Sequence, residues 1–228
     1  MMLPAVETLT PAETAVVASV SVRDVNRVID EKILPDPLYA VDRDRTRRLY
    51  VDSCVFIAFY FQAAGRLTAE ERSQTIATAT RQLRDQRRWR TLFTDWKVPD
   101  PESRIGEWTI SAEFLTIDLA PFLQRTRKRL IRLMAARALV TKDPEILGGT
   151  PVVRGTRIPV YDIAASVQAG LPRESIRKAY PGLSADDIDL AAFYAEANPP
   201  RGRPRRTTEP PPGSAIVSAH RAPRRQRK

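Results

Sequence analysis

The segment between residues 148 and 160 constrains the fold more than any other part of this chain, because glycine, proline and arginine alternate in it with short β-branched runs. Residues 151–153 and 157–160 are predicted to be extended, and Gly155 between them can adopt the positive φ of a tight turn. The prolines in both runs cannot donate to a sheet ladder, which limits this ribbon to an edge position. A two-stranded ribbon is only marginally stable alone, so we predict that a second copy of the chain covers it in a homodimer.

Three short helices are expected directly after the ribbon. They cover residues 162–169, 171–180 and 184–198, separated by Gly170 and by a serine that can cap the last helix. This succession of helix, glycine turn, short helix and helix is typical of a helix-turn-helix module, and its apolar positions, Leu171 among them, should form the core of that module.

Residues 142–198 are identified as a member of the domain-of-unknown-function family four-three-three, which is classed with VapB-type antitoxins. The residues that carry the resemblance are those at 143–146 and 149–160, Gly170, and those at 180–181 and 184–188. The resemblance implies a small helix-turn-helix fold, dimerisation, and a PIN-like ribonuclease toxin as partner.

Within this module, seven residues are expected to shape the hairpin and the dimer contact: Gly149, Pro151, Arg154, Gly155, Thr156, Arg157 and Pro159. Two roles stay open for Arg154 and Arg157, which either bind phosphate or pair with carboxylates of the fold such as Asp162. The segment lacks the spacing and the lysine of a nucleotide-binding phosphate loop, so an NTPase is excluded.

The N-terminal part carries two helix starts eleven residues apart. Thr10 and Ser21 can each cap a helix, with Glu13 and Asp24 in the reciprocal position of a capping box. The resulting pair of helices resembles the helix-turn-helix of the MerR-like and excisionase-like families, and the polar face of its second helix would contact DNA. The plain alternative is a helical hairpin with a solvated face. The predicted DNA contacts on this face are Arg23, Asn26 and Arg27.

A basic hairpin is expected next, with strands at residues 38–41 and 48–51. Its place after the second helix is that of a wing, whose arginines would contact phosphates. The alternative is a solvated turn in which the arginines pair with Asp42 and Asp44. The predicted wing contacts are Arg43, Arg45, Arg47 and Arg48.

The rest of the chain is predicted to be mainly α-helical with small β-hairpins. Helices are expected at residues 54–64 and 68–89, a hairpin at 107–118, and a long basic helix from 119 to about 139. The chain would then hold two winged-helix-like modules joined by a helix: an N-terminal domain at 1–118, a connecting helix at 119–141 and the antitoxin-family domain at 142–198.

Residues 199–228 form a proline- and arginine-rich segment with nine basic residues and one acidic residue. This composition cannot bury enough apolar surface to fold alone, so a disordered tail is expected. It could be merely solvated, contact DNA, or wrap the toxin and pair with the carboxylates of its metal site. The predicted toxin-binding residues are Arg203, Arg205, Arg206, Ile216, Val217, Arg221 and Arg224.

The remaining chemistry of the chain argues against an enzyme. Cys54 and His220 are the only cysteine and histidine, so we expect a buried structural thiol and neither a metal site, a cofactor nor a catalytic residue. No apolar run reaches the length of a membrane helix, and we expect a cytoplasmic protein without a membrane partner. The predicted function is a type II antitoxin that binds operator DNA and neutralises its toxin. The alternative is a stand-alone transcriptional regulator.

Overall fold

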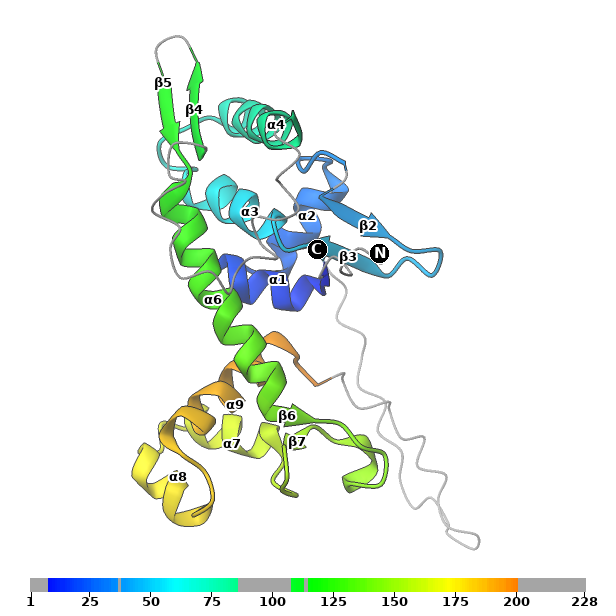
Figure 1. Cartoon of the computed structure of the whole chain (residues 1–228), viewed down its shortest axis with the longest axis vertical. Helices are drawn as coiled ribbons and strands as arrows, with labels where there is room; N and C mark the ends of the chain where they lie inside the picture. The colour runs from blue at the N-terminus through cyan, green and yellow to red at the C-terminus, as the bar shows by residue number, and fades with distance from the viewer. Residues whose placement is uncertain (1–7, 37, 86–107, 113–114, 201–228) are drawn as a thin grey trace, which may run out of the picture.

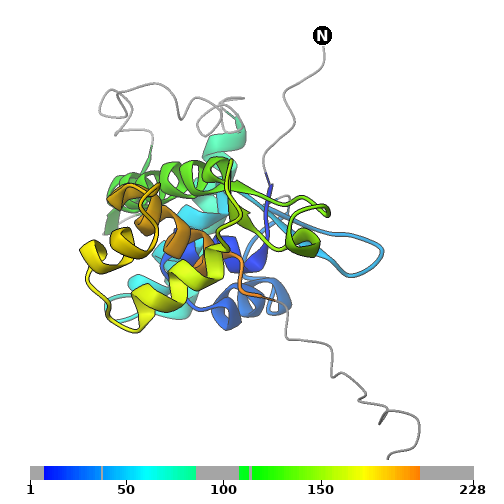
Figure 2. The same cartoon turned by 90° about the horizontal axis from the view of Figure 1, so that it is seen from below.

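The computed structural model describes residues 8–36, 38–85, 108–112 and 115–200. As predicted, the described residues are mainly helical, with small antiparallel strand pairings. One long helix, α6 (Ala120–Leu139), extends from the N-terminal group of elements to the C-terminal group (Figure 1). Seen from below, the C-terminal helices lie in front of the N-terminal ones, and the β2–β3 hairpin projects to one side (Figure 2).

The first two helices begin where their capping residues predict. α1 (Pro11–Ala18) and α2 (Val22–Asp30) each have a complete capping box, in which the side chain before the helix accepts from the third helical amide. Ser19 lies in the turn between them with φ 59°, a left-handed conformation that glycine adopts at lower cost. The tight turn brings the two helices together, as their spacing in the sequence suggested.

The N-terminal sheet combines three short strands in the order β1-β3-β2. β1 (Thr8–Leu9) and β2 (Tyr39–Val41) lie on either side of β3 (Arg47–Tyr50), and both pairings are antiparallel. The β2–β3 hairpin is therefore the expected one, within one residue of the predicted boundaries. It extends away from the helices toward solvent (Figure 1).

Two helices and a second hairpin complete the N-terminal half. α3 (Ser53–Gln62) is almost wholly buried, and α4 (Ala69–Asp85) follows it. β4 (Thr109–Ala112) and β5 (Leu115–Asp118) form the antiparallel hairpin expected before α6. The predicted end of α4 near residue 89 and the predicted start of the hairpin at 107 lie outside the described residues.

The C-terminal half corrects the expectation that the ribbon needs a second chain. β7 (Val152–Val153) pairs antiparallel with β6 (Val140–Thr141), which continues directly from α6, and on its other side the Val153 amide donates to the carbonyl of Ile158 (3.0 Å). Both edges of β7 are thus satisfied within one chain. The physical argument for a homodimer, an unpaired ribbon, no longer applies.

Three helices follow the ribbon close to the predicted positions: α7 (Val160–Gln168), α8 (Arg173–Ala179) and α9 (Ala185–Ala197). Gly170 ends the first with φ 75°, and Ser184 caps the last with a full capping box. Leu171 was expected in the core but is 47% exposed. It lies in the turn between α7 and α8, outside both helices, so neither helix directs its side chain inward.

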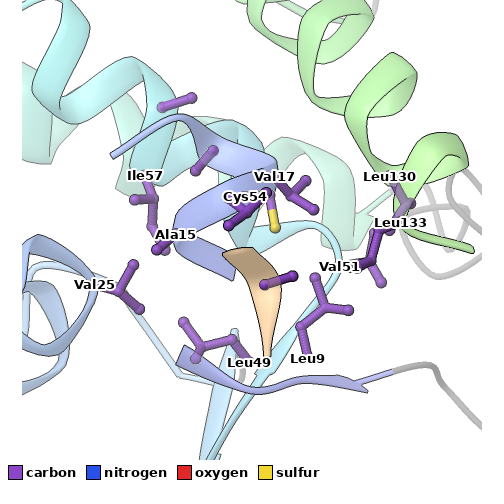
Figure 3. Packing of buried hydrophobic residues seen from close by; sticks show 14 of the residues in the cluster. Leu9, Ala15, Val17, Val25, Leu49, Val51, Cys54, Ile57, Leu130 and Leu133 are labelled. Atoms are coloured by element: carbon purple, nitrogen blue, oxygen red, sulfur yellow. The ribbon is translucent and has the colours of Figure 1, made fainter. Parts of the chain in front are cut away.

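One continuous cluster of buried residues connects the two halves. In Figure 3, Leu130 and Leu133 of α6 lie on the side of Val17 of α1 and of Val51, and the sulfur of Cys54 lies in the same cluster. α9 contributes Phe193 and Ala197 to the same cluster, and α1 contacts both α6 and α9. α6, which was expected only to connect two domains at residues 119–141, therefore packs against elements of both halves in one core.

A buried ion pair ties α1 to α6. Glu13, whose side chain is 5% exposed, accepts from Arg137 Nη2 (2.8 Å) and Nε (3.0 Å) through one carboxylate oxygen. Its other oxygen accepts from the amide of Thr10 (2.9 Å) in the capping box. Both carboxylate oxygens are occupied, which meets the condition for burying a charge.

Candidate nucleic-acid interface

The outer face of α2 carries the three residues predicted to contact DNA, and they differ in how they are held. Arg23 and Arg27 are exposed. The Arg27 Nε donates to Glu31 Oε1 (2.9 Å), a contact that raises the pKa of the guanidinium. Asn26 donates from Nδ2 to the carbonyl of Val22 (3.0 Å). Arg23 is thus the side chain at the start of α2 most available to a ligand.

Arg47 connects the β2–β3 hairpin to α2. Its Nη1 donates to Asn26 Oδ1 (2.7 Å), and its Nη2 donates to Asp30 Oδ1 (2.6 Å). The planar guanidinium suits such a fork, because it presents several donors in fixed directions. Asn26 and Arg47 were both predicted to contact DNA directly, but the structure binds them to each other. Their geometry suits fixing the angle between helix and hairpin.

Asp30 is the residue of this contact that the sequence interpretation missed. It lies four residues after Asn26 on α2, so the two share one helix face. The four-residue spacing of Asn26 and Asp30 was the feature of the sequence that could have indicated a shared contact. The strand residue that would reach this face could not be identified, because it depends on how the hairpin folds back onto the helix.

The arginines of the hairpin tip are exposed, and the aspartate between Arg43 and Arg45 is hydrogen-bonded to a threonine. Asp44 accepts from the amide (3.0 Å) and the hydroxyl (2.7 Å) of Thr46, and these hydrogen bonds lower the pKa of its carboxyl group. Its oxygens therefore shape the turn, in which Arg45 has φ 61°. Among the described residues, no close ion pair joins Arg43, Arg45 or Arg48 to Asp42 or Asp44, although the charge of Arg48 also contributes to the lowered pKa of Asp44.

In the C-terminal motif, Arg154 contacts backbone carbonyls at the end of α6. Its backbone amide donates to the carbonyl of Leu139 (2.8 Å), and its Nε donates to that of Ala138 (2.8 Å). Arg154 thus satisfies carbonyls at the end of α6, where cations are favoured by the helix dipole. Arg157 is exposed, and neither arginine pairs with Asp162 among the described contacts.

The other motif residues set the path of the backbone. Gly149 (φ 80°) and Gly155 (φ 74°) have left-handed conformations, as the glycine pattern suggested. Thr156 Oγ1 donates to the Val153 carbonyl (2.8 Å) and accepts from the Ile158 amide (3.1 Å). The carbonyl of Pro151 accepts from the Val160 amide, and Pro159 forms a bridge with Val152. These contacts lie within one chain.

Cys54 lies at the first turn of α3 and is completely buried, as predicted. Burial raises the pKa of its thiol, because the interior disfavours the thiolate. Among the described residues, no group of three or more His, Cys, Asp and Glu side chains is placed to hold a metal ion. The same part of the chain contains no helix with both the length and the apolar character that a membrane span requires.

The predicted toxin-binding residues lie outside the described residues, as do all positions from 201 onward. They are Arg203, Arg205, Arg206, Ile216, Val217, Arg221 and Arg224.

Comparison with known proteins confirms that the C-terminal module belongs to the domain-of-unknown-function family four-three-three. Residues 140–195 match the family described as "Protein of unknown function (DUF433)". The chain is 51% identical over 226 residues to "Uncharacterized protein y4eO" of Sinorhizobium fredii, covering 99% of this chain and 97% of that protein. Among solved structures, the X-ray crystal structure of Rv2018 from Mycobacterium tuberculosis is similar, with 16% identity, a TM-score of 0.34, and coverage of 80% of this chain and 95% of that one.

Proposed function

This chain belongs to the family of the Sinorhizobium fredii protein y4eO and contains a DUF433 domain, and on that premise we propose that it is a DNA-binding antitoxin of the cytoplasm. The proposal has two parts. α1, α2 and the β2–β3 hairpin form a winged helix-turn-helix that binds operator DNA. The C-terminal module, together with the basic segment at 199–228, neutralises a PIN-like ribonuclease toxin.

One observation supports the DNA-binding part above the others, and it is the Arg47 contact. The fork to Asn26 and Asp30 holds the hairpin against α2, and the hairpin itself projects beyond the body of the molecule (Figure 1). The arginines of its tip are exposed. A helix and a basic ribbon held at a fixed angle suit the major groove and an adjoining phosphate backbone. On this view Arg23 contacts bases or phosphates at the start of α2, and Arg43, Arg45 and Arg48 contact phosphates.

The first experiment measures binding to the DNA upstream of the gene by fluorescence anisotropy over a range of salt concentrations. Each phosphate contact contributes about 0.9 to the slope of log affinity against log salt. The double variant Arg43→Ala/Arg45→Ala should therefore lower the slope by about 1.8. A matched control, Arg177→Ala/Lys178→Ala, removes the same charge from α8, where both side chains are exposed.

The control also distinguishes the two candidate modules. If the α8 variant lowers the slope of log affinity against log salt and the hairpin variant does not, the C-terminal module is the part of the chain that binds DNA. If the two variants have equal effects, the binding is a general response to net charge and the assignment to the hairpin fails.

The toxin-neutralising part is supported by the resemblance of residues 142–198 and by the charge of the basic segment. Co-expression with the product of the adjacent gene tests it, because an antitoxin restores growth that the toxin inhibits. Removal of residues 199–228 shows whether that segment is required. Normal DNA binding without any growth rescue or co-purification would favour the alternative, a transcriptional regulator that has no toxin partner.

A further inference from the structure

A groove separate from the α2 and hairpin surface lies where α1 and α3 meet α6 and α9. A hollow of about 700 Å³ is lined by the end of α1, one side of α3, α6 and α9, and a second hollow of about 310 Å³ continues between α7 and α9. The two share Arg132, Phe193 and Glu196. We call this continuous depression the α6 groove.

Basic side chains of α6 dominate the groove. Arg125, Lys128, Arg129 and Arg132 all line the larger hollow, and their spacing of three and four residues places them on one helix face. From Arg125 to Arg132 the stripe extends about 10 Å along the helix axis, at about 1.5 Å per residue. Among the described residues, Glu196 is the only carboxylate that lines the larger hollow.

Among the described residues, the contacts that hold Arg129 and Arg132 of this stripe are made to neutral groups. Arg129 Nη1 donates to the Val16 carbonyl (2.8 Å), and the guanidinium of Arg132 lies 4.7 Å from the centre of the Phe193 ring. These partners are neutral. In the smaller hollow, Arg173 pairs with the carboxylate of Asp189 (2.7 Å), while Glu196 lines both hollows.

We propose that the α6 groove binds a small, flexible polyanion with several closely spaced phosphates. Arginine recognises phosphate oxygens with its fork of donors, and lysine adds a mobile point charge. The cations lie in a concave hollow whose volume is typical of small-molecule sites, and a slim oligophosphate can enter it more readily than a wide duplex. The free oligophosphate and the phosphate chain of a nucleotide share this chemistry.

Isothermal titration calorimetry of the full chain with sodium tripolyphosphate and, separately, with ATP tests the proposal without any reference to DNA. The variant Arg125→Gln/Lys128→Gln removes two cations of the groove, and Arg43→Gln/Arg45→Gln removes the same charge from the hairpin. We expect saturable binding that weakens at least tenfold in the groove variant and less than twofold in the hairpin variant. Bound ligand should also raise the melting temperature of the wild type.

The two ligands identify the source of the phosphates. Equal affinities indicate recognition of the phosphate chain alone, and tighter binding of ATP indicates that the nucleoside contributes as well. An unchanged melting temperature of the unliganded groove variant shows that it folds normally. The proposal is overturned if neither ligand binds saturably, if both variants weaken binding equally, or if the groove variant loses affinity for duplex DNA while its oligophosphate affinity stays the same.

Discussion

The ion pair between Glu13 and Arg137 should account for a large part of the attachment of α1 to α6. The substitution Arg137→Met keeps most of the aliphatic side chain but removes both donors to Glu13 Oε1. The carboxylate would stay buried with half of its hydrogen bonds, since Thr10 still donates to the other oxygen. A buried charge without its partner is among the few causes of large losses in stability.

The size of the effect follows from burial on the two sides of the pair. Removing one partner of a buried ion pair costs about 3–5 kcal/mol in free energy of unfolding. Arg137 is 30% exposed, so water can reach part of the vacated space, and we expect a loss near the lower limit, about 3 kcal/mol. Glu13→Gln keeps an acceptor for the capping box and replaces a charged hydrogen bond by a neutral one. We expect it to lower the free energy of unfolding by about 1 kcal/mol.

The double variant Glu13→Gln/Arg137→Met separates the pair from other effects. It buries no charge, so we expect a total loss of about 2 kcal/mol instead of the sum of the single losses, which gives a coupling of about 2 kcal/mol. Urea unfolding followed by far-ultraviolet circular dichroism measures all three variants, with Arg125→Met as an exposed control on the same helix. Additive single losses, or a loss in Arg137→Met no larger than in the control, would refute the reasoning.

Three further predictions concern local features. Ser19→Gly should stabilise the protein by about 0.5–1 kcal/mol, because glycine removes the cost of the left-handed turn; a lower melting temperature would contradict this. Cys54 should react with iodoacetamide far more slowly in the native protein than in the protein unfolded in urea, because burial raises the pKa of its thiol. Mass spectrometry measures the extent of alkylation, and equal rates in the two states would contradict this prediction. The lowered pKa of Asp44 stabilises the hairpin tip above the ordinary value of 3.8, and this contribution is lost as the pH falls through the lowered value. NMR titration should place the pKa of Asp44 below that of its Thr46→Val variant, whose residue 46 lacks the hydroxyl donor.

The sequence alone determined the positions of most helices and turns in this protein. The capping boxes at Thr10, Ser21 and Ser184 form between residues three positions apart, and the positive φ at Gly170 depends on the absence of a side chain at one position. Such interactions are complete within one turn of chain. Their residue types therefore predict them without knowledge of the remaining fold.

Only the tertiary structure decided which of these elements meet. Val140 pairs with Val153, Arg47 reaches Asp30 on α2, and Arg137 contacts a glutamate 124 residues earlier. Each contact depends on the packing of whole helices around one core. The sequence around a basic residue does not show whether its side chain will contact a carbonyl, a carboxylate or solvent. For this reason α6 was predicted only as a connecting helix, whereas in the fold its basic side chains contact α1 and line a groove.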